Sequence, residues 1–85
     1  MNNIDHLIQM ANSIGDFFEA QPDRQEALHS IADHIKKFWE PRMRTTMLDF
    51  LAQNPDGRTP EAELTDLVKQ ALVQHRELLT PKANA

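Results

Sequence analysis

Apolar side chains recur at intervals of three or four residues in four separate stretches of the chain. This spacing places the apolar residues of each stretch on one face of a helix. The pattern predicts helices over residues 3–20, 24–40, 42–53 and 60–79. No stretch shows the alternation of apolar and polar residues that is typical of a half-buried strand. We therefore expect an all-α fold, a small bundle of about four helices joined by short loops.

Prolines and capping residues separate the predicted helices. Asp23, with Glu26 three residues later, is typical of a helix start, where a side-chain oxygen accepts a hydrogen bond from a backbone N–H group. Pro41 is expected to end or sharply kink the second helix, because proline lacks a backbone donor and disfavours a helical residue before it.

The second half of the chain carries its own boundary residues. Residues 54–57, Asn-Pro-Asp-Gly, predict a turn. Thr59 is predicted to cap the fourth helix, with Pro60 as its first residue. Thr80 and Pro81 are expected to close this helix, and residues 81–85 are predicted to form a flexible tail.

Gly15 lies inside the first predicted helix, where a glycine costs about 1 kcal/mol relative to alanine. The simpler interpretation of this cost is close approach of a neighbouring helix. The alternative is a contact point for the backbone of a partner.

Composition narrows the possible function classes. Eighty-five residues fit a single domain over residues 1–85, and the absence of cysteine excludes disulfides, iron–sulfur ligation and cysteine catalysis. The net charge is −4, with 13 acidic and 9 basic side chains, which is unfavourable for bulk nucleic-acid binding. The sequence shows no secretory signal and no apolar run that approaches the ~18–20 residues of a membrane span. We therefore expect a soluble, cytoplasmic protein that binds neither nucleic acid nor membrane.

Candidate chemistry is sparse. His29 and His34 are five residues apart, so on a helix they point about 140° away from each other, whereas a zinc pair needs a spacing of three or four. Ser13 and Ser30 both fall inside predicted helices and lack the surroundings of a catalytic nucleophile. No glycine-rich loop is present to hold a phosphate. We therefore predict no catalytic, metal-binding or cofactor-binding residue in this chain.

Residues 36–44, with the sequence Lys-Lys-Phe-Trp-Glu-Pro-Arg-Met-Arg, carry the only tryptophan and four of the nine basic residues. Trp and Arg are enriched at the residues that dominate protein–protein binding energy. We expect a partner interface here, with the candidate residues Phe38, Trp39, Pro41, Arg42, Met43 and Arg44. Two alternatives remain open, namely a core tryptophan beside a solvated basic helix start, and binding of phosphate or nucleic acid.

The chain resembles a known family through a series of short matches. These are Met10-Ala11-Asn12, Ile14-Gly15, Phe17-Phe18, Pro22-Asp23, Ile31-Ala32, His34-Ile35 and, most specific, Phe38-Trp39 followed by Pro41-Arg42-Met43-Arg44. Together, these short matches are similar to the delta subunit of soluble NAD-dependent formate dehydrogenase. The similarity covers most of residues 4–53, whereas residues 60–79 fit only in general character.

The resemblance implies a non-catalytic accessory subunit of a molybdenum- or tungsten-containing formate dehydrogenase, whose expected partner is the large catalytic subunit. Molybdopterin, iron–sulfur clusters and FMN are then expected in the partner subunits and not in this chain. The sequence leaves open whether the chain is a permanent subunit or a transient assembly factor. The competing function is a free-standing helical adaptor or a DNA-binding regulator.

Overall fold

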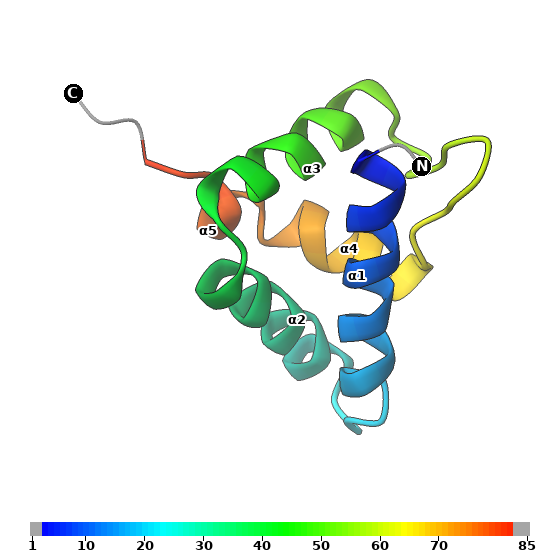
Figure 1. Cartoon of the computed structure of the whole chain (residues 1–85). Helices are drawn as coiled ribbons and strands as arrows, with labels where there is room; N and C mark the ends of the chain where they lie inside the picture. Colours follow the sequence, from blue (N-terminus) through cyan, green and yellow to red (C-terminus); the bar gives the residue numbers. More distant parts are fainter. Residues whose placement is uncertain (1–2, 83–85) are drawn as a thin grey trace.

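The computed structural model describes residues 3–82, and these residues form an all-helical fold. The helices are α1 (Asn3–Phe18), α2 (Arg24–Phe38), α3 (Pro41–Gln53), α4 (Asp66–Gln74) and the single turn α5 (Arg76–Leu79). Figure 1 shows α1, α2 and α3 as three sides of a triangle, with α4 behind them. The predicted all-α bundle is confirmed. Of the predicted tail, Pro81 and Lys82 lie outside any helix, and residues 83–85 lie outside the described part of the chain.

The core forms where the apolar faces of these helices meet. α2 contributes most to it, with Ala27, Leu28, Ile31, Ala32 and Ile35. α2 packs against α1, α4 and α5, so it is the central element of the bundle. No helix within residues 3–82 is long and apolar enough to cross a membrane.

The boundaries of α2 follow from local chemistry. The Asp23 carboxylate accepts hydrogen bonds from the backbone N–H groups of Gln25 and Glu26, at 2.8 and 3.3 Å, which confirms the predicted cap. At its other end, α2 stops at Phe38, and Trp39 and Glu40 adopt extended conformations. Pro41 then serves as the first residue of α3, where its missing N–H group is no loss because that group has no helical partner. The third helix therefore begins one residue earlier than predicted.

The prediction for the fourth helix is wrong in its start. Residues 54–65 form a loop, and α4 begins at Asp66 with Thr65 as its cap. The hydroxyl of Thr59 accepts from the N–H groups of Glu61 and Ala62, and the N–H of Thr59 donates to the carbonyl of Ala62 at 2.8 Å. These bonds fold residues 59–62 into a tight turn, so Thr59 stabilises a turn where the sequence predicted a helix cap.

The predicted fourth helix is also interrupted. His75 ends α4 and precedes α5, with φ −107° and ψ 29°. The change of direction at His75 allows Leu79 to pack in the core at 1% exposure. One continuous apolar pattern in the sequence therefore corresponds to two helices that approach the core from different directions.

Gly15 lies where α1 meets α4. A Cβ atom at this position would collide with Cγ2 of Val68, whose side chain is fully buried. The predicted close approach of a neighbouring helix is confirmed, with α4 as that helix.

Candidate functional site

The segment from Phe38 to Arg44 joins α2 to α3, and its two ring side chains point in opposite directions. Phe38 is 71% exposed, whereas Trp39 is 5% exposed and belongs to the hydrophobic core. The extended conformation of Trp39 turns its side chain away from the face that α2 presents at Phe38. The Trp39 side chain borders a space that is too small to hold a water molecule, and the other residues that line this space are Arg44 and core residues of α2, α3, α4 and α5.

The sequence left open whether Trp39 belongs to the core or to an interface, and the structure places it in the core. The inclusion of Trp39 among the interface residues is therefore corrected, because its buried ring is not available to a partner. The exposed ring at this site belongs to Phe38.

The two arginines of the segment also differ in their surroundings. Both lie in α3, so their side chains leave the helix about 200° apart. Arg42 is exposed, and its side chain has no partner among residues 3–82. Arg44 is half-buried, and its Nη1 donates to the backbone carbonyl of Leu79 at 3.1 Å. Arg44 therefore fastens α5 to the start of α3, while Arg42 is free to bind another molecule.

The remaining two of the predicted interface residues, Pro41 and Met43, lie at the border of the segment with solvent. Pro41 is exposed, and Met43 is half-buried and packs against the core. The segment thus presents Phe38, Pro41 and Arg42 outward and places Trp39 inward.

Phe38 is one end of a line of rings that spans two helices. The ring centroids of Phe38 and His34 are 4.6 Å apart, and those of His34 and Phe18 are 6.1 Å apart. Phe18 in turn meets Phe17 edge-on at 5.0 Å, and Phe17 is 78% exposed. We call Phe17, Phe18, His34 and Phe38 the aromatic row.

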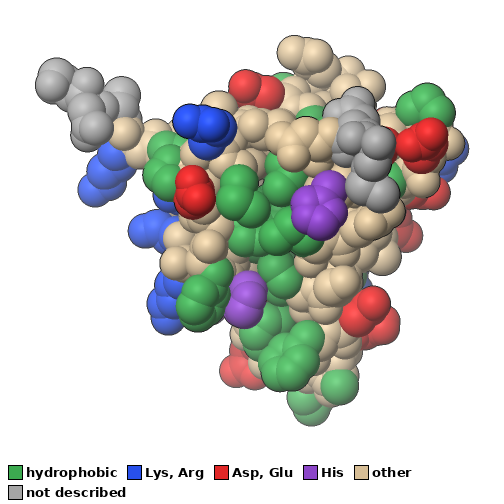
Figure 2. Space-filling model, viewed as in Figure 1, with side chains coloured by type: hydrophobic (Ala, Val, Ile, Leu, Met, Phe, Trp, Pro, Cys, Tyr) green, Lys and Arg blue, Asp and Glu red, His purple; other side chains and the backbone are tan. Residues whose placement is uncertain are grey.

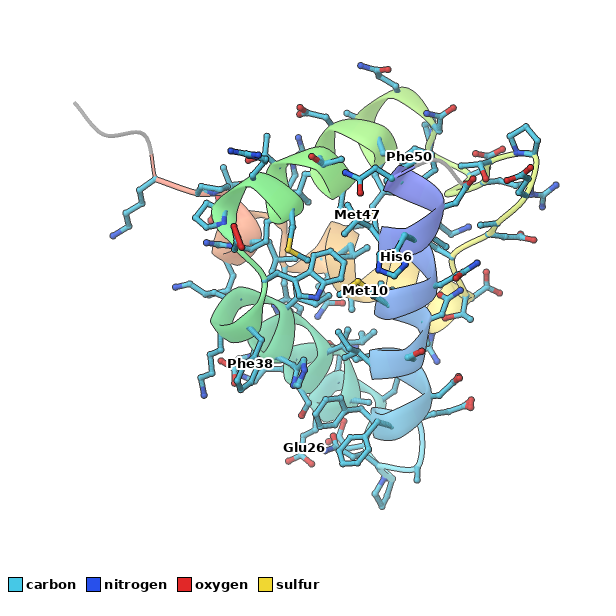
Figure 3. All side chains as sticks on the ribbon, viewed as in Figure 1. His6, Met10, Glu26, Phe38, Met47 and Phe50 are labelled. Atoms are coloured by element: carbon cyan, nitrogen blue, oxygen red, sulfur yellow. The ribbon has the colours of Figure 1, made fainter. Side chains whose placement is uncertain are left out.

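The aromatic row belongs to a wider apolar face. Figure 2 shows hydrophobic side chains gathered between two histidines and extending toward one end of the molecule. In Figure 3, Met10 of α1, Phe50 of α3 and Phe38 of α2 lie around this face. The apolar spacing of the sequence gave no signal that the rings of α1 continue into those of α2.

A groove of about 650 Å³ borders the Phe38–Arg44 segment at Pro41 and Arg44. Its lining combines the end of α2, the start of α3 and the α5 region: Lys36, Pro41, Arg44, Glu77, Leu78, Thr80, Pro81 and Lys82. Three of these side chains are cationic and one is a carboxylate. The groove is therefore suited to an anionic group.

The histidines are spread over several elements. His29 of α2 and His75 have ring centroids 5.6 Å apart, and the Nε2 atom of His75 is buried without a hydrogen-bond partner. Within residues 3–82, no three His, Cys, Asp or Glu side chains form a group that could hold a metal ion.

The serine hydroxyls have partners inside the chain. The Ser13 hydroxyl donates to the carbonyl of Gln9 at 3.1 Å, and the Ser30 hydroxyl donates to Oε1 of Gln21 at 3.3 Å. Neither hydroxyl is hydrogen-bonded to a base that would activate it as a nucleophile.

Comparison with known proteins identifies the family. The family model of the NADH-dependent formate dehydrogenase delta subunit, FdsD, matches residues 6–72. The match includes the whole Phe38–Arg44 segment, and it extends beyond the similarity seen in residues 4–53, through the loop and most of α4. The chain therefore belongs to this family of delta subunits. Neither the curated proteins nor the solved structures gave a match.

Proposed function

We propose that this member of the delta-subunit family is a non-catalytic accessory subunit of an NAD-dependent molybdopterin formate dehydrogenase. It stabilises or assembles the complex by binding the large catalytic subunit. The observation that carries the proposal is the family match over residues 6–72. In this proposal the molybdopterin, iron–sulfur and FMN groups belong to the partner subunits, and the complex works in the cytoplasm.

The side chains of this chain support a binding role. It has no cysteine to ligate an iron–sulfur cluster, and both of its serine hydroxyls are hydrogen-bonded within the bundle. Among residues 3–82, the most exposed large apolar side chains are Phe17 and Phe38, at 78% and 71% exposure. Large exposed apolar side chains that cluster on one face are typical of interaction surfaces.

The proposed contact includes Phe38, Pro41, Arg42 and Met43. Arg42 offers the planar group that forms paired hydrogen bonds with carboxylates, and Phe38 offers apolar area beside it. Arg44 has a double role, because it also holds α5 through Leu79.

Deletion of the gene tests the function. We expect formate-dependent reduction of NAD⁺ in cell extract to fall and the enzyme complex to lose subunits or size on gel filtration. Reintroduction of the wild-type gene should restore both. Full activity together with an unchanged complex in the deletion strain would contradict the proposal.

Purification of the complex through a tag on the large subunit distinguishes a permanent subunit from a transient assembly factor. A permanent subunit remains in the active enzyme in a fixed ratio, whereas an assembly factor is found only with the immature enzyme. Absence of this chain from both the active and the immature enzyme would argue against any direct role.

A further inference from the structure

The charges of this chain are strongly separated in space. Residues 36–44 and 76–82 hold six basic and two acidic side chains, a net charge of +4. The rest of the chain holds three basic and eleven acidic side chains, a net charge of −8. The groove lining brings the two basic segments together. We call the six cations of these segments the basic edge: Lys36, Lys37, Arg42, Arg44, Arg76 and Lys82.

Figure 2 shows this separation directly. Most of the Lys and Arg side chains visible in this view lie along its left edge, where α2 ends, α3 begins and α5 lies. Most of the acidic side chains are distributed over the rest of the visible face.

Cations outside the basic edge are engaged within the chain. Arg24 donates to Oε1 of Gln70 at 2.6 Å, Arg58 pairs with Glu63 at 3.0 Å, and Lys69 donates to the carbonyl of Asp56 at 3.4 Å. In the basic edge, Lys37 pairs with Asp33 at 3.0 Å and Arg44 holds Leu79. The other four side chains have no partner within the described residues: Lys36, Arg42, Arg76 and Lys82. The unused positive charge is therefore concentrated at one place.

The aromatic row ends at the basic edge. Phe38 directly follows Lys36 and Lys37 in the chain. The two extended residues Trp39 and Glu40 separate it from the start of α3, which holds Arg42. Two groove-lining residues thus lie close to Phe38 in the chain, because Lys36 is two residues before it and Pro41 is three residues after it.

We infer that the aromatic row and the basic edge form one two-part docking surface, which takes an acidic segment of a partner protein with apolar side chains next to its carboxylates. The carboxylates enter the groove, and the apolar side chains cover Phe38 and Phe17. The inference rests on the proposed function, in which this partner is the large catalytic subunit. Charge complementarity of this kind orients the two proteins and makes their association sensitive to salt.

A protein partner fits the charges better than a nucleic acid does. A polyanion that extends beyond the groove would meet the rest of the chain, which has a net charge of −8. A local acidic segment contacts only the cations.

Matched variants of the full chain test the surface. Arg42→Glu is paired with Arg24→Glu, because both arginines are exposed and lie in the first turn of a helix, where a glutamate is favourable. Phe38→Gln is paired with Val73→Gln, because Val73 is also exposed, at 63%, and lies on α4 away from the aromatic row. Each tagged variant is expressed in the native cell in place of the wild-type chain. The large catalytic subunit that co-purifies is measured at about 50 mM and about 500 mM salt.

We expect Arg42→Glu and Phe38→Gln to reduce co-purification at low salt by about tenfold or more. The controls Arg24→Glu and Val73→Gln should stay within about twofold of wild type. High salt should weaken capture by the wild-type chain and by Phe38→Gln to a similar degree, because Phe38 contributes no charge. Circular dichroism should show the same helicity for all four variants.

Several results would overturn the inference. Normal capture by both Arg42→Glu and Phe38→Gln would place the contact elsewhere while leaving the proposed function intact. Capture of nucleic acid, or of a second copy of this chain, that is lost in Arg42→Glu would assign the surface to another occupant. No capture of the large subunit by the wild-type chain at either salt concentration would instead contradict the proposed function itself.

Discussion

Two sides of this molecule differ in whether their polar side chains are hydrogen-bonded within the chain. Where the loop of residues 54–65 meets α1, polar side chains form hydrogen bonds with groups that are more than 50 residues away in the sequence. The Thr59 hydroxyl donates to the buried carboxylate of Asp5 at 2.6 Å, and the Asn12 amide donates to the carbonyl of Glu63 at 2.9 Å. At the basic edge, by contrast, four of the six cations have no partner within residues 3–82, and Phe38 is exposed.

This difference in hydrogen bonding indicates that one side of the molecule contributes to its stability and the other to binding. A bonded polar group that is shielded from water stabilises the fold, and removal of its partner costs about 1–3 kcal/mol. An exposed charge without a partner contributes little to the stability of the isolated chain. Substitutions on the loop side should therefore lower stability, and substitutions of exposed side chains at the basic edge should lower association only.

The strongest test of this comparison uses two adjacent residues. Trp39→Ala should lower the free energy of unfolding by about 3–5 kcal/mol, because it leaves a cavity in the core of a small domain. Phe38→Ala should change it by less than about 0.5 kcal/mol, because the ring is exposed. Urea unfolding followed by circular dichroism measures both. Equal losses at the two positions would contradict the opposite orientations of these rings.

The loop side is tested by Thr59→Val, which keeps the shape of the side chain and removes its hydroxyl. The free energy of unfolding should fall by about 2 kcal/mol, because Asp5 loses its donor and the turn at residues 59–62 loses its acceptor. This loss corresponds to roughly 8–16 °C in Tm for a domain of this size. Thr46→Val is the control, because the Thr46 hydroxyl donates only to the carbonyl of Arg42 one turn earlier. If the two variants melt at the same temperature, the loop is not held by Thr59.

The contact of α1 with α4 is tested by Gly15→Ala. The added methyl group collides with Val68, and overpacking costs about 1–3 kcal/mol, of which the better helix propensity of alanine offsets about 1. We expect a net loss of about 0–2 kcal/mol in calorimetry. In the double variant Gly15→Ala/Val68→Ala the loss should be smaller than the sum of the two single losses. Additive losses would show that the two side chains do not compete for the same space.

The smallest effect distinguishes the two arginines. Arg44→Ala should lower the free energy of unfolding by about 1 kcal/mol, because the carbonyl of Leu79 loses its donor. Arg42→Ala should leave it within about 0.5 kcal/mol of wild type. Urea midpoints at an unchanged slope measure the difference. Identical midpoints would mean that Arg44 does not hold α5.

Much of the helical architecture follows from the sequence because its causes are local. The apolar periodicity, the Asp23 cap and the effect of Pro41 all act within one or two turns of a helix, and the structure agrees at each of these positions. The wrong start of the fourth helix has a non-local cause. Thr59 and Pro60 resemble a helix start, but the Thr59 hydroxyl also donates to Asp5, which lies 54 residues away in the sequence.

The sequence by itself determined that this chain is all-helical and that residues 38–44 are unusual enough to carry a family resemblance. Only the tertiary structure decided which aromatic side chain of that segment is buried. It also joined the rings of α1 to those of α2 and brought residues 36–44 beside residues 76–82 in one basic edge. Helix periodicity states which residues share a face of one helix, but not which faces of different helices meet. That pairing is decided by packing between segments that are far apart in the chain.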